Sequence, residues 1–165
     1  MAFDAFLKIE GIPGESTDDK HKDWIEILSY SHGVSQPASG SVSSGGGRSA
    51  ERCDHSAFSI VKALDKASPK LNLYCCNGMH IKEIMVELCR AGGDKVKYME
   101  YKMTDAIVSQ VMPGGASSGG ETLPLESVSF NYGKIEWKYT ETDHLTGKPK
   151  GNVAAHWDLV ANKGS

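Results

Sequence analysis

The stretch Met1-Ala-Phe-Asp-Ala-Phe-Leu-Lys-Ile-Glu-Gly-Ile-Pro-Gly-Glu-Ser16 decides how the rest of the chain is interpreted. Apolar side chains recur at every second position over residues 3–9, with Asp4 and Lys8 between them. A period of two is typical of a strand with one buried and one solvated face. We therefore predict a first strand at 3–9 and a loop at 11–22, where turn-forming residues break the pattern.

The same alternation predicts the other strands. Extended segments are expected at residues 24–34, 53–64, 80–89, 96–112, 125–139 and 153–159. The segment 53–64 also allows a helical turn from Ile60 onward, so that assignment stays open. Ala91-Gly-Gly-Asp94 predicts a tight turn that joins two segments into a long hairpin. A polar loop is expected at 140–151.

One helix is predicted, at residues 68–77. Ser68-Pro69 is a strong start signal, because serine can cap free amides and proline fits the first helical position. Leu71 and Tyr74 then share a face, and Asn77-Gly78 supplies a left-handed stop. A helix of about ten residues is too short to be stable alone, so it should plug or flank a sheet.

The apolar phase changes within the segment 125–139. Apolar side chains take even positions up to Tyr132 and odd positions from Ile135, and Gly133 lies at the change. A glycine there predicts a β-bulge or sharp bend at a barrel corner. We therefore predict a mainly β fold, a small antiparallel β-barrel with one short flanking α-helix, in a single domain over residues 1–165.

Two tracts rich in Gly and Ser interrupt the strands, at about 35–50 and 113–121. They offer few side chains whose burial could offset the entropy of an ordered backbone. We expect both tracts to be flexible loops.

Composition excludes several classes of protein. The chain has 18 Lys and Arg against 21 Asp and Glu, a formal net charge of -3, so it lacks the basic excess of a nucleic-acid-binding protein. The first residues lack the basic and unbroken apolar regions of a signal peptide, and no stretch predicts membrane insertion. The cysteines are expected to be reduced, since two of the four are adjacent. They are Cys53, Cys75, Cys76 and Cys89.

The sequence predicts no catalytic, cofactor or metal site. Cys53-Asp-His55, and Cys75-Cys76 with His80, lack the paired spacing of a zinc site. The tract 114–120 is followed by Glu121, where a phosphate-binding loop needs lysine. No serine lies in a strand-turn-helix elbow. We expect no cofactor, no metal and no enzymatic activity.

The large aromatic residues leave two interpretations open. They could line a ligand cavity inside a barrel, or they could pack in the core or in a subunit interface, which we favour. These residues are Trp24, Tyr30, Trp137, Tyr139 and Trp157.

An ordered series of segments resembles the haemolysin-coregulated protein (Hcp) family, the tube subunits of bacterial type VI secretion. The series covers almost the whole chain and includes the 1–9 strand, Gly14-Glu-Ser16, Ser29-Tyr-Ser-His-Gly33, Asp65-Lys66, Ser68-Pro69, Ala91-Gly-Gly93 and both Gly/Ser tracts. The resemblance implies a homo-hexameric ring. Rings of the family stack into a tube, work with spike and sheath proteins, and carry and chaperone small effector proteins in the lumen. It also implies synthesis in the cytoplasm and export through the type VI apparatus without a cleaved signal peptide.

The resemblance also suggests functional surfaces. The family's lumen-facing strand corresponds to 24–34, where Ser29, Ser31 and Gly33 share one parity. We assign this small-residue face to the lumen, and the opposite parity stays open as the alternative. The loop 36–50 is the candidate for ring stacking, with a connector that has no partner as its alternative. The candidate stacking residues are Ser39, Ser43, Gly46 and Arg48.

Two other functions compete with the tube subunit. One is a monomeric or dimeric β-barrel that binds a small apolar ligand through Trp24, Trp137 or Trp157. The other is a hydrolase with a serine or cysteine nucleophile, which would require an activated thiol at Cys53 or Cys89.

Overall fold

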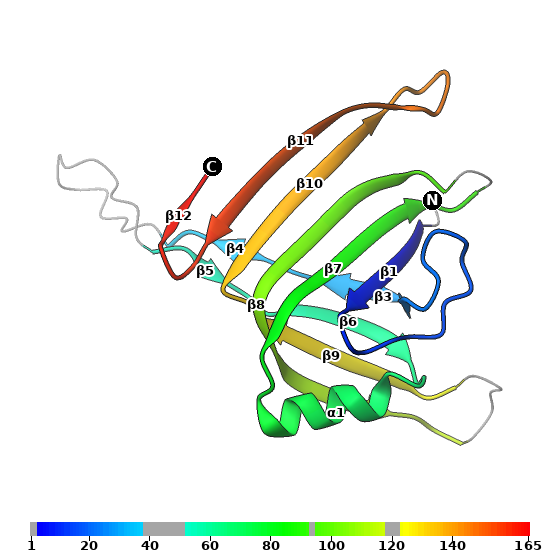
Figure 1. Cartoon of the computed structure of the whole chain (residues 1–165), viewed down its shortest axis with the longest axis vertical. Helices are drawn as coiled ribbons and strands as arrows, with labels where there is room; N and C mark the ends of the chain where they lie inside the picture. The colour runs from blue at the N-terminus through cyan, green and yellow to red at the C-terminus, as the bar shows by residue number, and fades with distance from the viewer. Residues whose placement is uncertain (1–2, 38–51, 93–94, 118–122) are drawn as a thin grey trace.

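The computed structural model describes residues 3–37, 52–92, 95–117 and 123–165, and it is mainly β (Figure 1). In the described part of the chain one helix is present, so the predicted mainly β fold with one short helix is confirmed. The elements are β1 (Phe3–Ile9), β2 (Ile25–Ile27), β3 (Ser29–Ser31), β4 (Val34–Ser35), β5 (Asp54–His55), β6 (Phe58–Ala63), α1 (Ser68–Asn77), β7 (Ile81–Arg90), β8 (Lys97–Gly114), β9 (Leu125–Asn131), β10 (Lys134–Thr142), β11 (Pro149–Asp158) and β12 (Lys163–Gly164).

The strand ladders run around the core and return to β8. From β8 the antiparallel pairs lead to β7, β1 and β2. The chain then turns from β2 into β3, and further pairs lead through β6 and β9 back to the second half of β8. Buried Leu7, Ile25, Ile60, Ile84 and Phe130 belong to one apolar cluster within this circuit. Each strand of the circuit has buried residues except β3, whose Tyr30 is half-buried.

The predicted strand at 24–34 is wrong as a single element, because the chain bends at Leu28. Ile25 and Ile27 are buried before the bend, whereas Tyr30 packs inward after it, so the inward parity changes. Leu28 itself is 61% exposed, and its amide donates to the Val61 carbonyl at 2.7 Å. The bend moves the chain from the sheet that contains β1 to the sheet that contains β6.

The predicted strand at 125–139 is likewise two strands, β9 and β10, and Gly133 lies between them. The Gly133 amide donates to the carbonyls of Thr104 and Asp105 in β8, at 3.0 and 3.1 Å. A side chain on Gly133 would bring its Cβ to 3.3 Å from the Asp105 Cβ. The close approach of two backbones is the physical reason for a small residue at this corner.

The predicted helix is confirmed at residues 68–77, including its left-handed stop. Gly78 has φ 63°, and its amide donates to the Tyr74 carbonyl. The proposed Ser68 cap is wrong: the N-cap position is Ala67, and the Ser68 hydroxyl accepts from the Asp65 amide at 3.1 Å. The helix contacts β8, and its Leu71 is fully buried in the core.

The hairpin of β10 and β11 is longer than predicted. The expected loop 140–151 shrinks to a turn in which the Asp143 amide donates to the Lys148 carbonyl, so both strands extend into the expected loop. The hairpin projects beyond the neighbouring strands (Figure 1). Seven of the ten β11 residues, from Pro149 to Ala155, are exposed. Packing within the chain therefore covers little of β11.

Candidate functional site

The candidate lumen residues Ser29, Ser31 and Gly33 are all exposed in the structure. The intervening side chains turn inward: Tyr30 stacks on Phe58 with ring centroids 5.9 Å apart, and His32 lies 5.4 Å from the same ring. Neither surface exposure nor strand parity identifies a lumen by itself. The geometry does separate a small, exposed side from a buried aromatic side.

Serines of the neighbouring strands extend this side of the sheet into a surface that we call the serine face, in which Ser109 is exposed, Ser59 and Ser127 are half-buried and Ser129 is buried. Ser31 pairs with Ser59 of β6, and Ser59 pairs with Ser129 of β9. The Ser59 and Ser129 hydroxyls lie 2.8 Å apart, and the Ser109 hydroxyl donates to the Ser129 carbonyl at 3.1 Å. The serine face comprises Ser29, Ser31, Ser59, Ser109, Ser127 and Ser129.

The serine face carries hydroxyl groups and no charge. The positions of β6 and β9 that alternate with the core are Ser, Val, Ala, Leu and Asn residues, without Lys, Arg, Asp or Glu. Sequence reasoning found only its first strand, because β3, β6 and β9 are brought together by long-range pairing. The signal in the sequence was the serine at alternate positions of each segment.

An aromatic and histidine cluster lies behind the serine face. The hydroxyls of Tyr30 and Tyr101 are 3.3 Å apart, and His55 Nδ1 lies 2.8 Å from the Tyr132 hydroxyl. Burial raises the pKa of both Tyr101 and Tyr132 well above the ordinary value. Burial, followed by the nearby His55, lowers the pKa of His32. Tyr30 and Trp137 are partly buried against the core, which agrees with the packing role favoured from the sequence over a ligand cavity.

The candidate stacking residues lie outside the described residues, so their assignment stays a prediction. They are Ser39, Ser43, Gly46 and Arg48. The described strands on either side of this loop form a two-stranded ribbon in which Val34 pairs with His55 and Ser35 with Asp54. Most of the first Gly/Ser tract and residues 118–121 of the second are also outside the described part.

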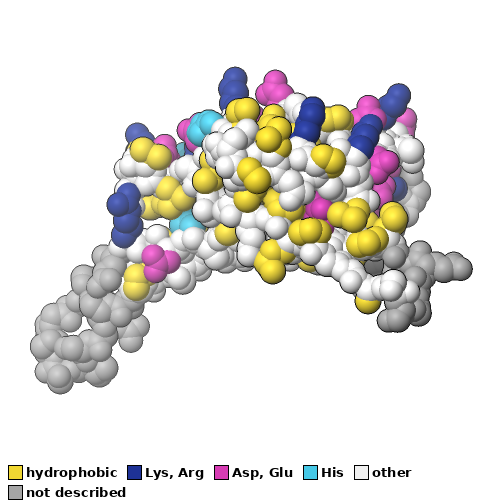
Figure 2. All heavy atoms as spheres, turned by 90° about the horizontal axis from the view of Figure 1, so that it is seen from below, with side chains coloured by type: hydrophobic (Ala, Val, Ile, Leu, Met, Phe, Trp, Pro, Cys, Tyr) yellow, Lys and Arg dark blue, Asp and Glu magenta, His cyan; other side chains and the backbone are white. Residues whose placement is uncertain are grey.

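Exposed apolar side chains mark further surfaces. On the β10–β11 hairpin, Tyr139 pairs with Val153, and these side chains are 47% and 72% exposed. Leu145 in the turn is 83% exposed. Seen from the α1 side, apolar side chains gather across the middle of the molecule and most charged ones lie nearer its upper margin (Figure 2). Exposed apolar side chains that gather on one surface favour contact with another protein.

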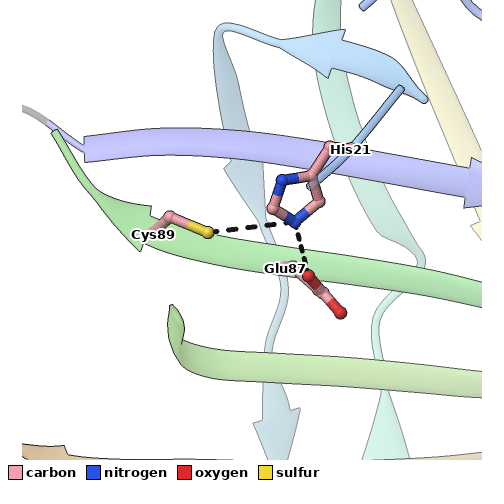
Figure 3. Close-up of side chains that lie close together, drawn as sticks. All are labelled: His21, Glu87 and Cys89. Atoms are coloured by element: carbon pink, nitrogen blue, oxygen red, sulfur yellow. Dashed lines mark hydrogen bonds and ion pairs between the residues drawn. The ribbon is translucent and has the colours of Figure 1, made fainter. Parts of the chain in front are cut away.

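A second cluster joins the loop before β2 to strand β7 (Figure 3). The His21 ring lies with Nδ1 2.7 Å from Asp18 Oδ2 and Nε2 2.6 Å from Glu87 Oε2. Cys89 Sγ lies 4.0 Å from the same Nε2. The His21 ring stacks on Phe6 at a centroid distance of 4.1 Å. His21 and Cys89 are almost completely buried, so this cluster is built into the protein.

Lysines complete the charge balance of the second cluster. Lys95 Nζ lies 2.7 Å from Asp18 Oδ1, and Lys97 Nζ lies 3.3 Å from Glu87 Oε1. The hydrogen bonds from Lys95 and His21 lower the pKa of Asp18 to about 2. Burial, followed by the negative charge of Glu87, raises the pKa of the Cys89 thiol to about 11. A thiol that resists ionisation is a poor nucleophile, which argues against the hydrolase alternative.

Sequence reasoning missed this cluster because its members are far apart in the chain. His21 and Glu87 are 66 positions apart. The spacing of Glu87 and Cys89, two residues apart on one strand, was the available signal. Among the described residues, His21, Glu87 and Cys89 are the group that could hold a metal ion. None of the three was considered as a metal ligand from the sequence.

The family model described as type VI secretion system effector, Hcp, matches residues 6–139. The chain is 34% identical to the protein hcp1 of Pseudomonas aeruginosa over 163 residues, which is 98% of each chain. It superposes with a TM-score of 0.92 on the structure of a type six secretion system protein, at 34% identity over 99% of this chain and 100% of the other. Hcp1 from Salmonella typhimurium gives a TM-score of 0.79 at 34% identity, with both chains fully covered.

These findings define a structural protein of bacterial type VI secretion. The chain belongs to the Hcp family, the secreted tube proteins of that system. The family is non-enzymatic, in agreement with the sequence prediction. In the described part of the chain, no helix is both long enough and apolar enough to cross a membrane.

Proposed function

We propose that the protein forms hexameric rings that stack into the type VI secretion tube, and that the ring lumen carries and chaperones small effector proteins. The chain is made in the cytoplasm and exported with the tube, without a cleaved signal peptide. Spike and sheath proteins are its further partners in the apparatus. Family membership supports assembly into the tube, and the surfaces described above supply the physical basis for each contact.

The β10–β11 hairpin is the observation that carries the ring assignment. β10 pairs with β8 over Lys134–Tyr139, so beyond Tyr139 the hairpin is two-stranded, and such a hairpin is marginally stable in water without a packing partner. Here the hairpin extends beyond the neighbouring strands, and it exposes Tyr139, Leu145 and Val153. Contact with a neighbouring subunit removes these groups from water at no cost to the core of either subunit.

Ring closure follows when that contact is head-to-tail. The hairpin of one subunit then covers a different surface on the next, and a rotation that divides a full turn closes the assembly. The open edge of β11 is covered in the same step, which protects it from unspecific strand pairing. Six such contacts make the hexamer.

The serine face is the proposed lumen surface. Hydroxyl groups can donate and accept hydrogen bonds with many partners. The outward positions of β6 and β9 carry no charge, which avoids selection by the sign of the cargo. Ser29, Ser31 and Gly33 form its margin on β3. The opposite parity is a poor lumen surface, because Tyr30 and His32 pack against Phe58.

The stacking contact is assigned to the loop 36–50, whose ends are held by the β4–β5 ribbon. A Gly/Ser-rich loop loses conformational entropy when it orders against a neighbouring ring, which keeps the contact reversible. A stacking assay with the loop shortened distinguishes the two alternatives: stacking is lost if the loop makes the contact and is unchanged if the loop has no partner.

The small-ligand alternative has weaker support. A hollow beside Trp24 has a volume of about 370 Å³, but it is lined by Lys8, Glu10, Lys82 and other charged side chains. Such a lining does not suit an apolar ligand. Native mass in dilute solution decides between the two functions, since the tube subunit is expected as a hexamer and the ligand carrier as a monomer or dimer.

A further inference from the structure

We propose that His21, Glu87 and Cys89 form a binding site for one zinc ion per chain. Their ligand atoms, one each of nitrogen, oxygen and sulfur, all lie within 4.8 Å of one another. Imidazole, carboxylate and thiolate are the side-chain ligands that zinc takes in proteins. The site is separate from the surfaces assigned to the ring and the lumen.

The hydrogen-bonding pattern of His21 requires a cation beside Nε2. Both ring nitrogens face carboxylate oxygens, with Asp18 at 2.7 Å and Glu87 at 2.6 Å. A neutral imidazole has one N–H and can satisfy one of these acceptors. The second contact, at 2.6 Å, therefore holds another proton, which a metal ion can replace when the two groups move apart. The Cys89 sulfur, 4.0 Å from Nε2, supplies the third ligand atom for such an ion.

The surroundings hold the His21 ring in the orientation that a ligand needs. Asp18 accepts from Nδ1, so Nε2 is the nitrogen that coordinates once its hydrogen bond with Glu87 opens, and this use of the two nitrogens is common to zinc-bound histidines. Phe6 stacks on one face of the ring with an interplanar angle of 5°, and Trp24 packs edge-on at 4.8 Å. The ring is thus fixed before any metal arrives, which lowers the entropic cost of binding.

Zinc binding leaves the local charge unchanged. The ion takes the place of two protons, the one in the hydrogen bond between His21 Nε2 and Glu87 Oε2 and the one on the Cys89 thiol, so a charge of two replaces a charge of two. Lys95 keeps its contacts with Asp4 and Asp18, which do not coordinate the ion. Lys97 Nζ lies 3.3 Å from Glu87 Oε1 and 2.7 Å from Glu100 Oε2, so it stays on those oxygens while Glu87 coordinates the ion through Oε2.

Small side-chain movements complete the coordination geometry. Zinc bonds of about 2.0–2.3 Å at tetrahedral angles separate two ligand atoms by about 3.4–3.6 Å. The distance from His21 Nε2 to Glu87 Oε2 must widen from 2.6 Å, and that to Cys89 Sγ must shorten from 4.0 Å. Glu87 is partly exposed and also lines the hollow beside Trp24, which gives the ion an entry path and room for a water as fourth ligand.

The bound ion would fasten the loop that contains Asp18 and His21 to strand β7. Loop and strand are far apart in sequence, so the cross-link removes conformational freedom from the unfolded chain as well as adding bonds to the folded one. We therefore expect zinc to raise the midpoint of thermal unfolding of the full-length protein.

The test is titration of metal-free, full-length protein with Co²⁺, a spectroscopic substitute for zinc. We expect one Co²⁺ per chain, with the intense visible bands of tetrahedral cobalt and a near-ultraviolet thiolate-to-cobalt charge-transfer band. Zinc should displace the cobalt and bleach both. Failure of the wild-type protein to retain Co²⁺ or Zn²⁺ after gel filtration would overturn the proposal in favour of a proton shared by His21 and Glu87.

Variants identify the ligands. Cys89→Ser should abolish the charge-transfer band, and Asp18→Asn should weaken binding about tenfold or more by releasing the ring orientation. Cys76→Ser changes an exposed thiol outside the cluster and is the matched control. A charge-transfer band that persists in Cys89→Ser, or disappears in Cys76→Ser, contradicts the assignment. If Cys89→Ser does not fold, Glu87→Gln replaces the partly exposed ligand and should weaken Co²⁺ binding, whereas unchanged Co²⁺ affinity in Glu87→Gln would contradict the assignment.

Discussion

The hydroxyls of Ser59 and Ser129 lie 2.8 Å apart across β6 and β9, on the side of the sheet that faces away from the core. Each belongs to a strand whose alternate residues are fully buried, among them Phe58 and Phe130. The pair therefore marks the middle of an uncharged hydroxyl surface on a rigid sheet. This relationship is the basis for assigning the serine face to the lumen.

Replacement of Ser31 tests the lumen assignment. Ser31→Gln adds a bulky flexible side chain to the exposed side of β3 and touches no core residue. We expect an intact ring with at least severalfold less effector recovered in co-purification. Ser165→Gln, at the exposed C-terminus, is the control and should retain cargo. Equal cargo recovery by both variants would show that β3 does not face the lumen.

Charge on the hairpin tests the ring interface. Val153 is 72% exposed in the single chain, so Val153→Asp should leave the fold intact. In the ring it buries an unpaired carboxylate, which costs several kcal/mol per site and recurs at six interfaces. Light scattering should therefore report a monomer. Asn152→Asp places the same charge on the opposite face of β11, and we expect that variant to stay hexameric; hexamers from Val153→Asp would rule out this face as the contact.

Alanine substitution of two glycines tests how the loop 11–22 packs against β2. A Cβ on Gly14 would lie 2.6 Å from the Ile25 Cα, whereas one on Gly151 meets nothing within 4 Å. The crowded atom belongs to the backbone, which cannot move aside cheaply. We expect Gly14→Ala to destabilise the fold by about 1–3 kcal/mol, and Gly151→Ala to have little effect. Urea unfolding of both variants gives the comparison, and equal midpoints would contradict the close approach.

The lowered pKa of His32 predicts that the folded protein loses stability in mild acid. Its pKa is lowered in the folded state, mainly by burial and then by His55, so the unfolded chain binds its proton more readily. The stabilising contribution is present above the ordinary value of 6.5 and is lost as the pH falls from there toward the lower folded-state pKa. The groups around the ring are His55, Phe58, Tyr101, Tyr132 and Trp137.

Thermal unfolding at pH of about 7.5 and 5.5 measures this loss. His32→Phe removes the titrating group and keeps an aromatic ring, so the fall in midpoint between the two pH values should be smaller than in the wild type. His144→Phe, at an exposed turn position, should fall as much as the wild type. Protein concentration must be equal in all samples, because assembly contributes to apparent stability. A His32→Phe midpoint that falls as steeply as the wild type would contradict the account.

Local patterns predicted the elements whose environment is uniform along their length. The alternation in 3–9 gave β1 because Ala5, Leu7 and Ile9 on one face of that strand pack on the core. The helix was predictable from Pro69 and Gly78, which act within a single turn of the chain. The hairpin of β7 and β8 was predictable for the same reason, since a short turn joins two long alternating segments.

Features that depend on distant parts of the chain escaped prediction. The bend at Leu28 arises because β2 pairs with β1 and β3 with β6, and neither partner is visible from the local sequence. Ser68 was misassigned because its hydroxyl bonds to Lys62 and Asp65. His21 and Cys89 meet only when the loop folds over β7. The Gly133 corner was anticipated by the change in apolar phase, but its division into two strands was not.

The native mass of the full-length protein in dilute solution, by light scattering with negative-stain imaging of the same fraction, tests the central claim most directly. The account predicts six chains in a ring with an open centre. A monodisperse monomer at high protein concentration would contradict it, because the exposed hairpin and the serine face would then have no subunit to contact and no lumen to line.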